Sequence, residues 1–195
     1  MQPERDASPP VPTPAGGACT VWTVGHSTLS EVDFLALLAA YRIEALVDVR
    51  RFPASKRYPH FNGSALQSSL APLGIEYLGL PALGGRRAPL PDSPNTGWRN
   101  ESFRGYADHI ATAEFAGGMR ELRALAGRKR TAIMCAEAVW WRCHRSLISD
   151  VLKSQGWSVI HILSEKSASE HPYTSPARII NGKLTYPEDQ LSLGE

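Results

Sequence analysis

The chain has 195 residues, enough for one compact domain with a substantial hydrophobic core. Its apolar fraction of 43% and charged fraction of 21% are ordinary for a soluble globular protein, and its net charge of +2 excludes a surface that is basic throughout. Three cysteines exclude a disulfide framework, so we expect a reduced, cytoplasmic location.

The N-terminal segment is predicted to be a disordered tail that covers residues 1–19. It is rich in Pro, Gly and small residues, and it lacks the basic and apolar regions of a signal peptide. No later segment approaches the roughly 20 apolar residues of a membrane span, so we expect no membrane partner. Residues 20–195 are predicted to form a single α/β domain.

Short β-branched and apolar runs predict the strands of this domain, at 21–24, 45–49, 75–80, 132–134 and 158–163. Helical spacing of apolar residues predicts helices at 30–41, 64–73 and 103–126, the last with a break at Gly117-Gly118. A further helix is expected after Glu137, with residues 142–145 in its early turns. Asn181-Gly182 between two β-prone runs predicts a type I′ hairpin over 177–186.

Strands that alternate with helices predict an α/β fold. We expect a mostly parallel open sheet with helices on both faces, and a C-terminal β-hairpin that adds an antiparallel edge. In such a sheet the loops that follow the strands meet at one edge. We therefore expect His26, Asp48, Cys135 and Glu137, each of which ends or follows a predicted strand, to line one cleft.

The candidate catalytic residues are Glu137, Asp48, His26 and Cys135. Cys135 and Glu137 are two residues apart, so in an extended segment their side chains point to the same side and reach one substrate. Glu137 would act as acid, base or nucleophile together with Asp48 or His26. The alternatives are structural: a buried thiol, a satisfied histidine, and an ion-pair partner for Asp48.

Arginine and aromatic side chains accompany these groups. Guanidinium forks suit phosphate, and aromatic faces suit unstacked bases. The candidate substrate-binding residues are Ser27, Arg50, Trp140, Arg142, His144 and Arg145. Further basic and aromatic residues lie in loops expected to reach the same edge, namely Arg51, Lys56, Arg57, Arg86, Arg87, Arg99, Phe52, Tyr58, Phe61, Trp98 and Trp141. Simple loop packing is the alternative. The predicted partner is an anionic small molecule or a nucleic acid, and the oligomeric state stays open.

The cysteines do not have the spacing of a common zinc site. Cys135, Cys143 and His144 lack a CxxC or HxxxH pair, and adjacent residues on a helix point about 100° apart. We therefore predict no metal and no other cofactor, and the alternative is a zinc site completed by a ligand such as His26 that the fold brings in. The loop after Cys135 also departs from phosphatases and rhodaneses, because the anion-binding arginine of those loops would fall at Trp141 and no glycine relaxes the segment.

Several of these motifs together resemble the domain-of-unknown-function family 488. The matching motifs are Gly25-His26-Ser27, Val47-Asp48-Val49-Arg50 with Pro53 and Ser55, Cys135-Ala136-Glu137, Cys143-His144-Arg145 and His171-Pro172-Tyr173-Thr174. They span about residues 21–187. The resemblance implies an α/β domain with a polar site built from these motifs, and it implies no particular reaction.

The leading hypothesis is an enzyme that acts on a phosphate-bearing substrate, a nucleotide or a nucleic acid, by carboxylate acid/base or nucleophilic chemistry. Hydrolysis or transfer at a base–sugar bond would suit such carboxylates. One alternative is a sulfur-transfer or redox enzyme that uses Cys135, with Cys143 as a resolving thiol. The other is a non-enzymatic module that binds nucleic acid with the same arginine and aromatic side chains.

Overall fold

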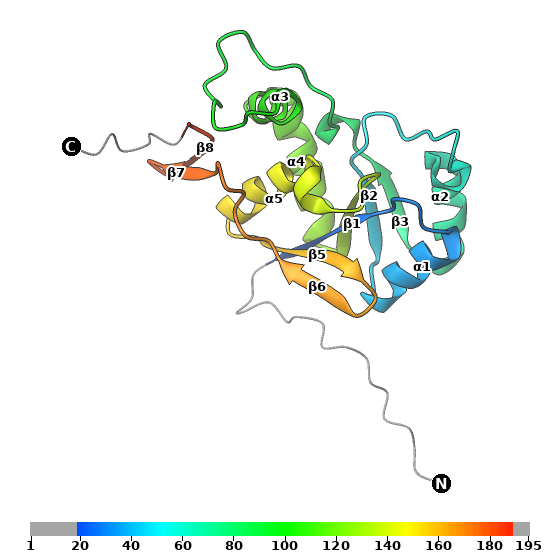
Figure 1. Ribbon diagram of the computed structural model, residues 1–195. Helices are drawn as coiled ribbons and strands as arrows, with labels where there is room; N and C mark the ends of the chain where they lie inside the picture. The colour runs from blue at the N-terminus through cyan, green and yellow to red at the C-terminus, as the bar shows by residue number, and fades with distance from the viewer. Residues whose placement is uncertain (1–18, 189–195) are drawn as a thin grey trace, which may run out of the picture.

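The structure is a computed structural model that describes residues 19–188 (Figure 1). The predicted N-terminal tail therefore lies almost wholly outside the described residues. The strands are β1 (Thr20–Gly25), β2 (Ala45–Asp48), β3 (Glu76–Gly79), β4 (Thr131–Cys135), β5 (Ser158–Ser164), β6 (Ser167–Glu170), β7 (Arg178–Ile180) and β8 (Lys183–Thr185). The α-helices are α1 (Glu31–Ala40), α2 (Gly63–Leu70), α3 (Glu101–Ile110), α4 (Ala113–Ala126) and α5 (Arg145–Ser154). The 3₁₀ helices are η1 (Pro59–Phe61), η2 (Ala71–Leu73), η3 (Pro81–Leu83) and η4 (Trp140–Arg142).

The main sheet has six strands in the order β3-β2-β4-β1-β5-β6. Strands β1 to β5 are parallel, and β6 pairs antiparallel with β5. The predicted fold class is confirmed, but the antiparallel edge is β6 and not the hairpin. Strand β6 was not predicted because Ser167-Ala168-Ser169-Glu170 is polar and has no β-branched residue.

The C-terminal hairpin forms a separate two-stranded sheet of β7 and β8. Asn181 and Gly182 both have positive φ, at 50° and 75°, as the predicted type I′ turn requires. Leu184 and Tyr186 carry this end of the chain onto the core beside α5. The hairpin thus covers the domain without extending its main sheet (Figure 1).

Helices cover both faces of the main sheet, so each face has its own core. On one face α1 and α2 pack Phe34, Leu38, Leu66 and Leu70 against the strands. On the other face α3, α4 and α5 pack a second set of side chains against the strands, among them Tyr106, Leu122, Leu147 and Leu152. Figure 1 shows the two helical layers on either side of the strands. Among residues 19–188, no helix is both long and apolar enough to cross a bilayer.

Two predicted helix boundaries are wrong. The break between α3 and α4 lies at residues 111–112 and not at Gly117-Gly118, because the Thr112 side chain caps α4 by accepting from the Phe115 N–H. Both glycines lie inside α4. Helix α5 begins only at Arg145, after the short helix η4 and an extended residue, Cys143. Residues 142–144 are therefore outside the helix that was expected to carry them.

Candidate functional site

A cavity of about 630 Å³ lies where β1, β2 and β4 end. This is the edge at which open α/β sheets bind ligands. Most of the predicted site residues line it, namely His26, Ser27, Arg50, Cys135, Glu137, Arg142 and His144. Three do not lie among the lining residues, namely Asp48, Trp140 and Arg145. The expected convergence of strand ends is therefore observed for most of the set.

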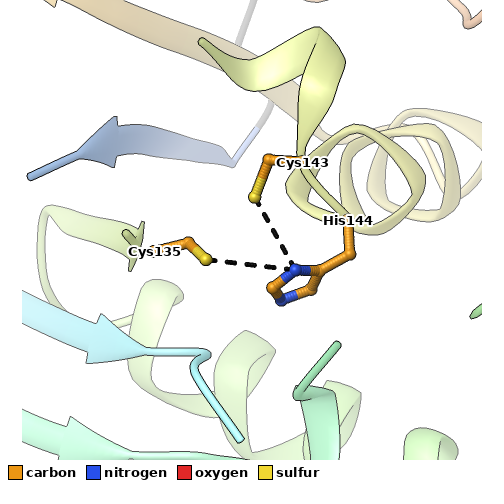
Figure 2. Close-up of side chains that lie close together, drawn as sticks. All are labelled: Cys135, Cys143 and His144. Carbon is orange, nitrogen blue, oxygen red and sulfur yellow. Dashed lines mark hydrogen bonds between the residues drawn. The ribbon is translucent and has the colours of Figure 1, made fainter. Parts of the chain in front are cut away.

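Two thiols and an imidazole meet on the cavity wall. The Cys135 Sγ lies 4.0 Å from the His144 Nδ1, and the Cys143 Sγ lies 3.6 Å from the same nitrogen. All three atoms lie within 4.8 Å of one another. Figure 2 shows the two sulfur atoms pointing toward the ring nitrogen, one from the end of β4 and the other from the segment before α5. We call these three side chains the Cys–Cys–His cluster.

The backbone before α5 explains how adjacent residues reach one point. Cys143 is extended, with φ −132° and ψ 146°, whereas His144 has the helical values −57° and −13° as the N-cap residue. The prediction of no shared site rests on the assumption that Cys143 and His144 take consecutive helical positions about 100° apart. That assumption fails here, because a change of backbone conformation between the two residues turns both side chains toward Cys135.

Contacts around the imidazole fix its orientation. The His144 Nε2 donates a hydrogen bond of 2.9 Å to the Val49 carbonyl, so the proton of a neutral ring sits there and the Nδ1 lone pair faces the sulfurs. Gly85 lies against the ring, and a Cβ at Gly85 would stand 2.9 Å from Nδ1. The Tyr106 ring packs 5.0 Å away, centroid to centroid. The imidazole is therefore held in place from three sides.

The two thiols of the cluster differ in acidity. Its hydrogen bond to Cys143, followed by burial, raises the pKa of the Cys135 thiol well above its usual value. Burial alone would also raise the pKa of Cys143, but the hydrogen bond from Cys135, the imidazole of His144 and the charge of Arg145 together hold it well below. Cys143 is therefore the more acidic thiol of the pair.

Arg145 joins the Cys–Cys–His cluster to the loop after β4. Its side chain is buried, and its Nε donates to the Cys143 Sγ over 3.4 Å. Its Nη2 donates to the Glu137 carbonyl over 2.5 Å. A Cβ at Gly25 would overlap this carbonyl oxygen, so only glycine lets β1 and the loop after β4 approach so closely. The structure therefore gives Arg145 a positioning role and not a place in the cavity.

Asp48 and Arg50 form a buried ion pair under the cavity floor. The Arg50 Nε and Nη2 donate to the Asp48 carboxylate over 2.8 Å and 2.5 Å, and the Tyr77 hydroxyl donates over 2.9 Å. Asp48 is 1% exposed. Its carboxylate is occupied by these donors, which matches the structural alternative of an ion-pair partner and leaves it poorly placed to act as a base.

His26 is held neutral next to this ion pair. The Arg50 Nη1 donates to the His26 Nε2 over 3.3 Å, so the ring proton sits on Nδ1, which donates to the Ser27 carbonyl over 3.1 Å. Burial and then the Arg50 charge lower the pKa of His26 to about 4. The ring also stacks on Phe61 at 4.0 Å. At neutral pH His26 is therefore an uncharged wall of the cavity.

The rim of the cavity is basic. Arg51, Arg57, Arg86 and Arg142 line it, are exposed, and form no ion pair with any carboxylate of residues 19–188. We call these four residues the arginine rim. Glu137 is the one acidic side chain among the lining residues of this cavity, and it is exposed there. The other basic residues expected at this edge, Lys56, Arg87 and Arg99, do not line the cavity, and Arg87 pairs with Glu114 at 3.0 Å.

Trp140 lies outside the cavity, in a separate buried network. Its ring stacks on His161 at 4.2 Å with an interplanar angle of 6°. Some cavity residues were not singled out from the sequence, namely Gly85, Ser102, Phe103 and Tyr106. For Gly85 the available signal was the length and composition of the loop over 81–100, because long loops of this kind are often functional. The other three residues lie in α3.

The family described as Domain of unknown function DUF488 matches residues 31–152, more than half of the chain. The chain therefore belongs to this family, as its motifs indicated. The match covers the ends of β2 and β4 and the Cys–Cys–His cluster, but not Gly25-His26-Ser27 or His171-Pro172-Tyr173-Thr174. Neither a curated protein nor a solved structure matches the chain significantly. The family description names no activity, so the function must be argued from the site.

Proposed function

We propose that this protein is an enzyme that acts on a phosphate-bearing substrate, a nucleotide or a nucleic acid, held in the cavity. The observation that carries the proposal is the arginine rim. Four exposed guanidinium groups without carboxylate partners surround a cavity at the ligand-binding edge of the sheet. Guanidinium groups bind phosphate through paired N–H donors, so an anion satisfies them.

Aromatic side chains beside the rim favour a nucleotide over a simple anion. Phe52 is 64% exposed and lines the cavity together with Tyr58 and Phe103. An exposed aromatic ring next to a guanidinium group is a stacking surface for a base. The Arg51 guanidinium lies 5.7 Å from the centre of the Phe52 ring. A phosphate on the rim would thus place a base within reach of these rings.

Glu137 supplies the carboxylate of the proposed reaction. It lines the cavity, and its carboxylate has no hydrogen bond or ion pair with the residues that the structure describes. A free carboxylate beside a bound substrate suits general acid/base or nucleophilic work. Asp48 was the other candidate, but its oxygens are occupied by Arg50 and Tyr77. We therefore assign the chemistry to Glu137 alone.

Charge reversal at the rim tests binding. Fluorescence anisotropy with a labelled single-stranded oligonucleotide, with ATP as competitor, measures affinity at low and high salt. Arg86→Glu or Arg142→Glu should weaken binding at least about 10-fold, and salt should weaken wild-type binding. Arg128→Glu is the matched control, because Arg128 is exposed at the opposite edge of the sheet, before β4. Equal affinity of all these variants would refute the proposal.

A substitution at Glu137 tests catalysis once a converted substrate is found among nucleotides and oligonucleotides. Glu137→Gln keeps the shape of the side chain but removes the base, so turnover should fall about 100-fold while binding persists. Glu165→Gln, at the exposed turn between β5 and β6, should leave turnover unchanged. Unchanged turnover in Glu137→Gln would show that the carboxylate does not take part. Binding without turnover of any substrate would favour a non-enzymatic binding module.

A thiol enzyme is the second candidate, and the proximity of Cys135 and Cys143 favours it. Their sulfurs lie within 4.8 Å of each other, on the same cavity wall. Two such thiols can exchange between a dithiol and a disulfide when a disulfide substrate is supplied and reduced. In that case Cys135→Ser and Cys143→Ser abolish turnover, and Glu137→Gln is mild. The order of these three effects therefore separates the two candidates.

A further inference from the structure

We infer that Cys135, Cys143 and His144 form a metal site that binds one Zn²⁺ and leaves a coordination position open to the cavity. The inference concerns the Cys–Cys–His cluster alone. It does not depend on the arginine rim or on the identity of the substrate. Metal binding and substrate binding are therefore tested by separate measurements, and either can fail without the other.

The spacing of the donor atoms fits tetrahedral zinc. With Zn–S bonds of about 2.3 Å and Zn–N bonds of about 2.0 Å, tetrahedral ligands lie about 3.5 Å apart for sulfur and nitrogen. The observed distances from the His144 Nδ1 are 3.6 Å to Cys143 and 4.0 Å to Cys135. Figure 2 shows all three donor atoms aimed at the space between them. Tetrahedral zinc holds two sulfur ligands about 3.8 Å apart, and the two sulfurs here lie within 4.8 Å of each other, so closing the site around an ion brings them together by at most about 1 Å.

The hydrogen bonds that neighbouring groups make to the cluster side chains are of the kind found around metal ligands. A metal-binding histidine almost always donates its second ring N–H to a carbonyl or a carboxylate. His144 does so through Nε2 to Val49, which leaves Nδ1 as the ligand atom. A metal-bound thiolate commonly accepts a hydrogen bond, and Cys143 accepts one from the Arg145 Nε. Both ligands are therefore oriented before any ion arrives.

The donor set selects the metal by its chemistry. Two sulfurs and one imidazole nitrogen are soft and borderline ligands, which suit Zn²⁺ and do not suit Mg²⁺ or Ca²⁺. Structural zinc sites have four protein ligands, whereas catalytic sites have three and an open position. This cluster offers three ligands, and all three line the cavity. The open position therefore faces the space in which a substrate would lie.

The position of Glu137 gives the site a use in the proposed enzyme. Glu137 follows Cys135 by two residues and lines the same cavity. A ligand held there would meet the metal on one side and a free carboxylate near it. Zinc supplies Lewis-acid chemistry and activates water when it is bound at such a site. Arg145, Val49 and Gly85 then serve as positioning residues, because each acts through a cluster ligand.

Direct metal analysis tests the inference on the full chain. The reduced, chelator-treated protein should take up one Zn²⁺ per chain, measured by competition with a chromophoric chelator under anaerobic conditions. Cobalt in place of zinc should give a thiolate-to-metal charge-transfer band. Cys135→Ser, Cys143→Ser and His144→Gln should each lose at least about 100-fold in Zn²⁺ affinity, since even outer contacts are worth 10–100-fold. Failure of the reduced wild-type protein to bind Zn²⁺ would overturn the inference.

Matched controls separate loss of a ligand from general damage. Cys19→Ser removes an exposed thiol outside the cluster, and His60→Gln removes an imidazole outside the cavity lining, so both should keep wild-type affinity. Zinc should also protect Cys135 and Cys143 of the wild-type protein from alkylation while Cys19 stays reactive, as measured by mass spectrometry. This second measurement needs no variant to fold. Unprotected cysteines, or a reversible Cys135–Cys143 disulfide in a protein that takes up no zinc, would overturn the metal site.

Discussion

Two clusters of titratable side chains flank α5, and they differ in how their polar atoms are satisfied. The Cys–Cys–His cluster lies before the helix and opens to a cavity. The second cluster is a buried chain that runs from Thr23 through His161 and His171 to Asp150, with contacts of 2.7, 2.9 and 2.9 Å. We call it the histidine chain. The histidine chain contains two imidazoles and a carboxylate, yet none of its residues lines the cavity.

The histidine chain is closed at every position. Asp150 accepts from His171, from the Thr174 N–H and hydroxyl, and from the Tyr186 hydroxyl over 3.1 Å. If both rings are neutral, Thr23 donates to His161, which donates to His171, which donates to Asp150, and every donor finds one acceptor. This network ties the segment after β6 to the sheet and to α5.

In the Cys–Cys–His cluster, by contrast, the polar atoms are not paired one donor to one acceptor. The Nδ1 lone pair of His144 and the lone pairs of the two sulfurs converge on one point. Buried polar groups are normally paired one to one. The comparison teaches that a satisfied network contributes stability, whereas converging acceptors beside a cavity indicate a ligand. The experiments below compare the two clusters on that basis.

The largest expected effect is on stability, at Asp150. Asp150→Ala removes the acceptor of four donors, and loss of one partner in a buried charged network costs about 4 kcal/mol. Urea unfolding measures this free energy. The control Glu170→Ala removes a carboxylate whose side chain is 73% exposed, and should change it by less than about 0.5 kcal/mol. Zinc affinity should be unchanged in the folded Asp150 variant.

A smaller loss of stability is expected on substitution of Trp140, whose ring packs against the histidine chain. Trp140→Ala removes the ring stacked on His161, and should lower the free energy of unfolding by about 3 kcal/mol. Trp141→Ala is the matched control, because this neighbouring ring is 54% exposed. If Trp140 instead stacks a substrate base, oligonucleotide affinity falls while stability stays, and the division into two clusters fails.

Acid should destabilise the histidine chain. Burial, followed by the positive charges of His171 and Arg145, lowers the pKa of His161 to about 2 in the folded protein. The unfolded state takes up a proton below about pH 6.5 and the folded state does not, so stability falls as pH drops toward the folded value.

The groups that face His161 are Thr23, His171 and Trp140, with Asp150 at the far end of the chain. Between about pH 7.5 and about pH 5, wild type should lose about 2 kcal/mol more than His161→Gln, as followed by urea unfolding at each pH. Parallel pH profiles of the two proteins would show that His161 ionises in the folded state.

The smallest stability effect is expected in the Cys–Cys–His cluster. His144→Gln loses one hydrogen bond to Val49, so without metal the free energy of unfolding should fall by only about 1 kcal/mol. At Zn²⁺ about 100-fold above its Kd, wild type should gain about 2.7 kcal/mol and the variant nothing. A large metal-free loss in this variant would place His144 among structural residues, like the histidine chain.

The sequence by itself determined the architecture of this protein. Short apolar runs separated by helical segments predict strands β1 to β5. Because these strands are parallel, their carboxyl ends meet at one edge of the sheet. His26, Cys135 and Glu137 follow those strands, so their convergence on the cavity was predictable from local patterns. Local signals also fixed the Asn181-Gly182 turn. The polar strand β6 had no such signal, because only its pairing with β5 makes it a strand.

Tertiary structure alone decided which polar groups are free to react. Asp48, Arg145 and Trp140 have reactive or binding side chains by type, but contacts in the folded chain occupy each of them. Asp48 accepts from Arg50 and Tyr77, Arg145 donates to the Glu137 carbonyl, and Trp140 stacks on His161. Cys143 and His144 meet Cys135 because the backbone turns between them, which the helical pattern did not reveal. Hydrogen-bond satisfaction depends on long-range contacts, so residue type and spacing could locate the site but not assign its members their roles.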